Sequence, residues 1–146
     1  MYWYILRWKR TFDFKGRSRR TEYWMSFLVD LFISFFLGFI SISMGMGGLM
    51  PQVYYVVIII PILGATVRRL HDSGRSGWWL LLLGFPVVSE LVALNPDMAV
   101  SLLGIILSIS SFIACITLFI FMLQDGQVGE NNYGKNPKTL EDLGEL

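Results

Sequence analysis

The single histidine of the chain, His71, stands beside Asp72 in the segment RRLHDSGRSGWW, residues 68–79. A histidine next to a carboxylate could take part in acid–base chemistry or bind a metal ion. A catalytic triad also needs a nucleophile and a third, orienting group, and a metal site needs two or three further ligands. The sequence spacing provides neither set. We therefore expect a charged turn between two helices, with a docking or headgroup-binding site and catalysis at His71 as alternatives.

The rest of this segment favours a turn. Gly74 and Gly77 provide flexible turn positions, and Arg68, Arg69 and Arg75 can pair with lipid phosphates. The chain has one cysteine, which argues against a cysteine-rich zinc site. We expect no cofactor.

A second group of charged residues lies in FKGRSRRTEYW, residues 14–24, directly before an apolar run. Arg17, Arg19 and Arg20 form a basic cluster in which Glu22 can pair locally. Such a cluster beside a membrane is worth something like 1 kcal/mol per charge toward an anionic leaflet. The cluster alone does not specify a function.

The third candidate, Asp30, lies six residues past Trp24 within that apolar run. This spacing places its carboxylate about 9 Å into a membrane, where it needs a partner or water. We expect an ion pair with Arg68 or Arg69, which end the next apolar run on the same side. A proton or cation relay is the alternative. Glu90 lies near the opposite interface and is too far away in depth to pair with Asp30.

The elements that must position these residues follow from composition and charge. The 146 residues suffice for one domain, of which 54% are hydrophobic and 16% charged, against about 25% charged in soluble domains. The mean hydropathy is +0.56. All twelve Lys and Arg residues fall within 1–23, 68–77 and 124–146. This segregation indicates an integral membrane protein and argues against a nucleic-acid-binding protein with a basic face.

Four apolar runs approach the length of about 20 residues that a helix needs to cross a bilayer. The predicted spans are residues 24–46, 52–67, 78–94 and 99–123. The second and third are short and carry Pro61 and Pro86, so a re-entrant segment remains an alternative. We predict one all-α membrane domain over residues 1–146, a four-helix bundle.

The basic residues predict the orientation. With four spans, the three basic segments share one side, whereas loops 47–51 and 95–98 hold no Lys or Arg. The positive-inside rule then places both termini in the cytoplasm. The basic N-terminus and first apolar run lack an A-x-A-like cleavage site, so we expect the run to be retained.

Outside the spans, MYWYILRW predicts a short interfacial helix and residues 124–146 a polar tail. Two spans carry stripes of small or polar residues, which we expect to face into the bundle and each other. The stripe of the first span is Ser26, Asp30, Ser34, Gly38, Ser41 and Gly45. The stripe of the fourth span is Gly104, Ser108, Ser111 and Cys115.

Three motifs carry a resemblance to a known family. The run F-x-G-R-x-R-R-x-E-Y-W at residues 14–24 resembles the first signature of the domain of unknown function 805 family of small bacterial inner-membrane proteins. RRLHDSGRSGWW resembles the second signature, and GQVGENNYGKNP, residues 126–137, the third. The resemblance covers nearly the whole chain and implies a helical inner-membrane protein. It implies no activity.

On the predicted topology the three signatures lie on one face, and we expect them to fold together into a cytoplasmic cap. The cap comprises Arg17, Arg19, Arg20, Glu22, Arg68, Arg69, His71, Asp72, Gly74, Gly77, Asn131, Tyr133 and Gly134. We expect a non-catalytic module that binds lipid headgroups or a partner protein through this cap, with homo-oligomerisation open. One alternative is a small transporter or channel subunit that uses Asp30. A weaker alternative is an interfacial lipid-modifying enzyme that uses His71 and Asp72.

Overall fold

The structure, a computed structural model, describes the backbone of residues 1–142 and the side chains of residues 1–139. The last four residues of the predicted tail lie outside this part. The described residues form helices and no strand. The elements are α1 (Tyr2–Lys9), α2 (Arg20–Ser43), α3 (Leu49–Asp72), the 3₁₀ helix η1 (Gly77–Leu83), α4 (Gly84–Ala93), α5 (Pro96–Ala99), α6 (Leu102–Leu123) and α7 (Pro137–Asp142).

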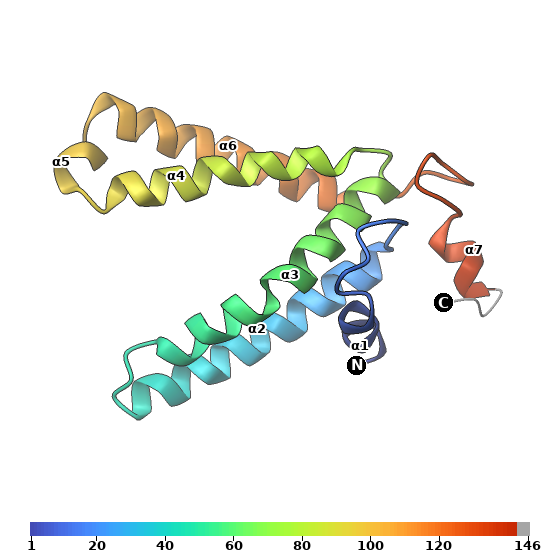
Figure 1. The fold of residues 1–146 in the computed structure, drawn as a ribbon, viewed down its shortest axis with the longest axis horizontal. Helices are drawn as coiled ribbons and strands as arrows, with labels where there is room; N and C mark the ends of the chain where they lie inside the picture. Colours follow the sequence, from blue (N-terminus) through green and yellow to red (C-terminus); the bar gives the residue numbers. More distant parts are fainter. Residues whose placement is uncertain (143–146) are drawn as a thin grey trace.

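The long helices pair as two hairpins. Helices α2 and α3 form the first, while η1, α4 and α6 form the second, with α5 at its turn (Figure 1). The hairpins meet where α3 ends and η1 begins, and they separate toward their far ends, like the arms of a V (Figure 1). Near the meeting point, Trp24 of α2 packs on Phe119 of α6 with ring centres 5.7 Å apart. The expected four-helix bundle is therefore not confirmed.

Three of these helices are long and apolar enough to cross a membrane: α2, α3 and α6. The remaining predicted span, the third at residues 78–94, corresponds to a shorter apolar segment of 17 residues from Gly77 to Ala93. Helix α3 runs well past the predicted end at residue 67, because residues 68–72 continue it. The side chains of Arg68 and Arg69 form hydrogen bonds within the protein. Helix α3 has 24 residues and is not the short span that hydropathy predicted.

The 3₁₀ geometry of η1 has a cause in the sequence. Pro86, in the first turn of α4, has no N–H to donate to the carbonyl of Leu82, and its ring crowds that carbonyl. The chain before it instead closes with the tighter i→i+3 pattern over Gly77–Leu83. The Ser76 side chain caps this segment by accepting from the Trp78 backbone N–H at 3.3 Å.

The distribution of side chains is the reverse of that in a soluble domain. Large apolar side chains along the arms are open, for example Phe32, Phe35 and Ile113 at 67%, 69% and 58% exposed. The buried set at the meeting point is charged, including Arg17, Glu22, Arg68, Arg69 and Asp72. An apolar exterior of this extent fits a hydrocarbon environment.

The small-residue stripes do not face each other. On α2, the Ser26 hydroxyl donates to the Trp3 carbonyl of α1 at 3.3 Å. The Ser41 hydroxyl accepts from the backbone of Gly48 and Met50 at the start of α3. On α6, Gly104 lies against the α5 backbone, and the Ser108 hydroxyl meets Ser89 of α4 at 3.4 Å. The α2 stripe is therefore used toward α1 and the start of α3, and the α6 stripe toward α4 and α5.

Candidate functional site

Arg17, in the loop between α1 and α2, ties three parts of the chain together. Its Nε donates to Asp72 Oδ1 at the end of α3 over 3.0 Å. Its Nη1 and Nη2 donate to the carbonyls of Gly129 and Gln127 in the C-terminal tail, over 2.6 and 2.5 Å. The side chain is almost fully buried. One guanidinium therefore joins all three sequence signatures.

Asp72 is held from both sides. Its Oδ2 accepts from Arg69 Nη1 at 2.5 Å, while Oδ1 accepts from Arg17. Arg69 continues to the end of α6, where it donates to the carbonyls of Met122 and Gln124. The tail passes so close to Asp72 that a Cβ at Gly126 would overlap the carboxylate. Buried charges that are hydrogen-bonded on several sides can persist without water.

Arg68 joins α3 to the loop before α2. Its Nη1 donates to the carbonyls of Arg10 and Asp13 at 2.8 and 2.5 Å, and its Nε donates to the Ser18 hydroxyl at 3.1 Å. Its Nη2 lies 3.7 Å from Oε1 of the buried Glu22. The arginine is completely buried, so its charge is used to hold this loop on α3 and is not presented at the surface.

His71 takes part in packing. Its ring stacks on Tyr133 with centres 3.8 Å apart and planes 6° from parallel, and its Nδ1 lies 3.2 Å from the Gly16 carbonyl. Asn131 Nδ2 donates to the His71 carbonyl at 3.0 Å, and Asn131 Oδ1 accepts from the Tyr133 backbone N–H at 2.9 Å. Gly134 closes the same turn through two backbone bonds with Asn131. The third signature thus covers the turn that holds the second.

Glycine is favoured at the two turn positions, Gly74 and Gly77, on different grounds. Gly74 has φ +76°, and a Cβ there would overlap the Gln127 side chain of the tail. Gly77 has an ordinary backbone, but a Cβ would lie 3.2 Å from Val67 Cγ1. Both positions therefore allow the turn to pack closely, one on the tail and one on α3.

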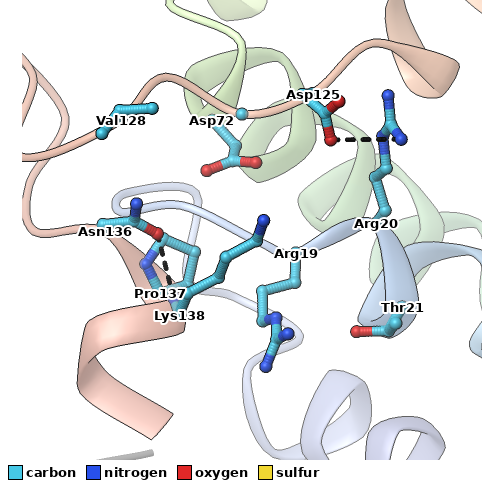
Figure 2. A pocket seen from close by; sticks show the side chains of 10 residues that line it. Arg19, Arg20, Thr21, Asp72, Asp125, Val128, Asn136, Pro137 and Lys138 are labelled. Atoms are coloured by element: carbon cyan, nitrogen blue, oxygen red, sulfur yellow. Dashed lines mark hydrogen bonds and ion pairs between the residues drawn. The ribbon is translucent and has the colours of Figure 1, made fainter. Parts of the chain in front are cut away.

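Arg19 and Arg20 line an open pocket of about 380 Å³, together with Asp72. Figure 2 shows this pocket between the start of α2, Asp72 and the C-terminal tail. Lys138 of α7 extends into it from the tail side (Figure 2). The other lining residues are Thr21, Asp72, Asp125, Gly126, Val128, Asn136 and Pro137.

The described lining of the pocket holds more basic than acidic side chains. Asp72 already accepts from Arg17 and Arg69, which lie behind it. Asp125 pairs with Arg20 at 3.1 Å on the open rim. Arg19 and Lys138 also line the pocket, so its described lining holds three basic side chains and two acidic ones. Among the described residues, no group of three or more His, Cys, Asp or Glu side chains is placed to hold a metal ion.

Asp30 lies away from the cap, and its expected partners were wrong. It pairs with Arg7 of α1: Arg7 Nη1 donates to Oδ2, and Nη2 donates to Oδ1 at 2.7 Å. The Tyr54 hydroxyl also donates to Oδ1 at 2.7 Å. Arg68 and Arg69 are engaged at the end of α3, whereas Asp30 lies ten residues, about 15 Å, along α2.

Sequence reasoning missed Arg7 as a functional residue. Arg7 sits among aromatic residues in MYWYILRW, for which the sequence predicted only a short interfacial helix. One signal was available in the sequence. Asp30, in an apolar run, needs a basic partner, and the short N-terminal helix carries basic residues that could reach it by folding back on α2. Helix α1 does so, and Arg7 is only 2% exposed.

The fold and the cap define an α-helical membrane protein whose buried charges gather where its two hairpins meet. Residues 11–135 match the family described as "Protein of unknown function (DUF805)", and the chain belongs to this family.

Two relatives are similar along nearly their whole length. The inner membrane protein YhaH of Escherichia coli (strain K12) is 32% identical over 143 residues, which covers 94% of this chain and 98% of YhaH. The inner membrane protein YhaI of the same strain is 30% identical over 139 residues, covering 94% and 97%. No solved structure matches the chain. The named relatives and the three membrane-length helices agree on an inner-membrane protein.

Proposed function

We propose that the protein is a non-catalytic inner-membrane module that binds the headgroup of an anionic phospholipid. The binding site is the pocket lined by Arg19, Arg20 and Lys138. In this proposal η1 and α4 cross the membrane as a fourth span, and both termini lie in the cytoplasm.

The single observation that carries this proposal is the charge of the pocket at the end of a membrane-length helix. Arg20 is the first residue of α2, so the pocket lies at the level where the apolar segment begins. Arginine and lysine are the side chains that proteins use to bind phosphate oxygens. The start of α2 adds the favourable field of a helix N-terminus, and Arg19 makes no side-chain cap there.

The orientation is supported by the same charges. The basic segments 1–23 and 68–77 and the described part of the third, residues 124–142, come together at the end where the hairpins meet. The positive-inside rule places that end in the cytoplasm, where the leaflet surface is anionic.

The absence of catalysis is supported by how the cap uses its reactive side chains. His71 is stacked on Tyr133, and both carboxylate oxygens of Asp72 accept from arginines. Both groups therefore serve to hold the turn and the tail. An enzyme would instead need them aimed at a substrate.

The test is lipid retention by the purified protein in detergent, measured by native mass spectrometry. Phosphatidylglycerol and phosphatidylcholine of equal chain length are compared. We expect Arg19→Gln/Lys138→Gln to weaken phosphatidylglycerol binding by roughly thirtyfold, because two charges near a lipid phosphate contribute about 2 kcal/mol. Phosphatidylcholine binding should change little.

The matched control is Lys15→Gln/Lys135→Gln, which removes the same charge from residues outside the pocket lining. It should leave phosphatidylglycerol retention close to that of the unaltered protein. Equal loss in both double variants would mean that net charge alone attracts the lipid, and the pocket would have no role. An unchanged affinity in the Arg19/Lys138 variant would also refute the proposal.

A further inference from the structure

We propose that one acyl chain of the bound phospholipid lies in an apolar cavity between the two hairpins, so that the protein holds a whole lipid molecule. This inference rests on the proposed headgroup site and extends it. The ligand class becomes an anionic phospholipid in place of any soluble phosphate.

The cavity has a volume of about 320 Å³ and lies at the fork of the V. Its walls come from four elements: α2, α3, η1 and α6. The lining residues are Tyr23, Trp24, Phe27, Ile62, Thr66, Leu83, Cys115, Leu118, Phe119 and Met122. This size and apolar character are those of ligand cavities in proteins, which begin near 300 Å³.

The apolar cavity adjoins the basic pocket along helix α2. Arg20 lines the pocket and Trp24 lines the cavity, four residues later on the same helix face. Four residues correspond to a rise of about 6 Å. A phospholipid places its phosphate and the start of its chains in this same order across the membrane boundary.

The end of α6 repeats this arrangement on the facing wall. Met122 lines the cavity, and Asp125, three residues on, lines the pocket. The two walls are joined at both levels, because Trp24 Nε1 donates to the Met122 carbonyl at 3.3 Å and Arg20 Nε to the Gln124 carbonyl at 2.9 Å. The contact between α2 and α6 is thus polar beside the pocket and apolar beside the cavity, which matches the two parts of an amphiphilic lipid.

A chain in the fork differs from the lipid that covers any membrane protein. At an exposed position of one arm, such as Ile113 of α6 or Phe35 of α2, a chain meets the helices of that hairpin alone. In the fork it contacts residues of four elements at once, and its many weak contacts add up. These contacts give a reason for one lipid to remain bound when detergent removes the others.

The test fills the cavity without changing a charge. Cys115→Phe places a ring in the lining, whereas the control Ile116→Phe places one at the neighbouring, exposed position of α6. Retention of dipalmitoyl phosphatidylglycerol is measured by native mass spectrometry, with dihexanoyl phosphatidylglycerol as the short-chain probe. We expect Cys115→Phe to weaken retention of the long-chain lipid about tenfold and to leave the short-chain lipid unaffected. Ile116→Phe should change neither.

The outcomes separate the two proposals. If Cys115→Phe retains the long-chain lipid as well as Ile116→Phe does, the acyl-chain inference is wrong, whatever the charge variants show. If Arg19→Gln/Lys138→Gln weakens neither lipid, the headgroup site is wrong, even where Cys115→Phe has its expected effect. If glycerol phosphate displaces both lipids equally well, the ligand is a soluble phosphate.

A second measurement on the unaltered protein guards against misfolding of the Cys115→Phe variant. Phosphatidylglycerol with a photoreactive group in one chain is added, cross-linked and mapped by peptide mass spectrometry. We expect adducts on Trp24, Leu118 or Phe119. Adducts confined to outer positions such as Phe35 and Ile113 would overturn the inference.

Discussion

At the scale of single residues, the stability of the folded protein depends on charged side chains that are buried. Arg17, Arg68, Arg69, Glu22 and Asp72 are each at most 4% exposed. A buried ion pair adds little net stability, but removal of one partner leaves the other charge uncompensated and costs about 3–5 kcal/mol. The cap should therefore tolerate loss of a central charge far less well than loss of a rim charge.

Asp72 provides the first test of this difference. Asp72→Asn leaves the guanidinium groups of Arg17 and Arg69 facing a neutral amide, so we expect a loss of about 3 kcal/mol in stability. The control is Asp125→Asn, which breaks the open pair with Arg20 and should cost under about 1 kcal/mol. Thermal unfolding in detergent measures both. Similar melting temperatures for the two variants would contradict the view that Asp72 centres the cap.

The pair between Arg7 and Asp30 is the second residue-scale test. Asp30→Asn and Arg7→Gln should each destabilise the protein by about 3 kcal/mol, because each leaves one buried charge alone. The double variant should cost clearly less than the sum of the two, since neither charge remains. Thermal unfolding of all four proteins gives the coupling. Strictly additive losses would mean that the residues act independently, and the pairing would be wrong.

At the scale of elements, the apolar runs were enough to find the three membrane-length helices and the shorter apolar segment Gly77–Ala93, because lipid-facing helices are apolar along their whole length. The arrangement of these segments was not predictable from the stripes. The stripe through Ser26 and Ser41 shows that a face is in contact, but not whether α1, α3 or α6 makes the contact. The sequence likewise grouped the cap residues through their motifs, but it could not reveal that Arg68 and Arg69 continue α3 and point inward.

The position of the C-terminal tail depends on the close approach of Gly126 to the Asp72 carboxylate. Gly126→Ala would force its backbone away from the Asp72 carboxylate, so we expect a loss of about 1–3 kcal/mol. The released tail should become a substrate for limited proteolysis near Gln127. Gly38→Ala on α2 is the control, because a Cβ there meets nothing within 4 Å. A tail that stays as resistant in Gly126→Ala as in Gly38→Ala would show that it is not held by this contact.

At the scale of the whole molecule, the V-shaped arrangement of the hairpins and the distribution of basic residues predict the same membrane topology. If η1 and α4 cross the membrane, the α2–α3 turn and the α5 turn lie outside, while the cap lies inside (Figure 1). The 17 apolar residues from Gly77 to Ala93 make this crossing the least secure, since a span usually needs about 20. Both turns can be probed separately.

Cysteine labelling in intact cells tests this topology, on a Cys115→Ser background that removes the only native thiol. Met46→Cys and Asp97→Cys report on the two far turns, and Ser73→Cys and Lys138→Cys on the cap. We expect an impermeant maleimide to label only the first two. Labelling of Met46→Cys without Asp97→Cys would mean that α4 re-enters and does not cross. Labelling of Ser73→Cys from outside would mean that the protein has the opposite orientation. The basic pocket would then face away from the anionic cytoplasmic leaflet that the proposed function requires.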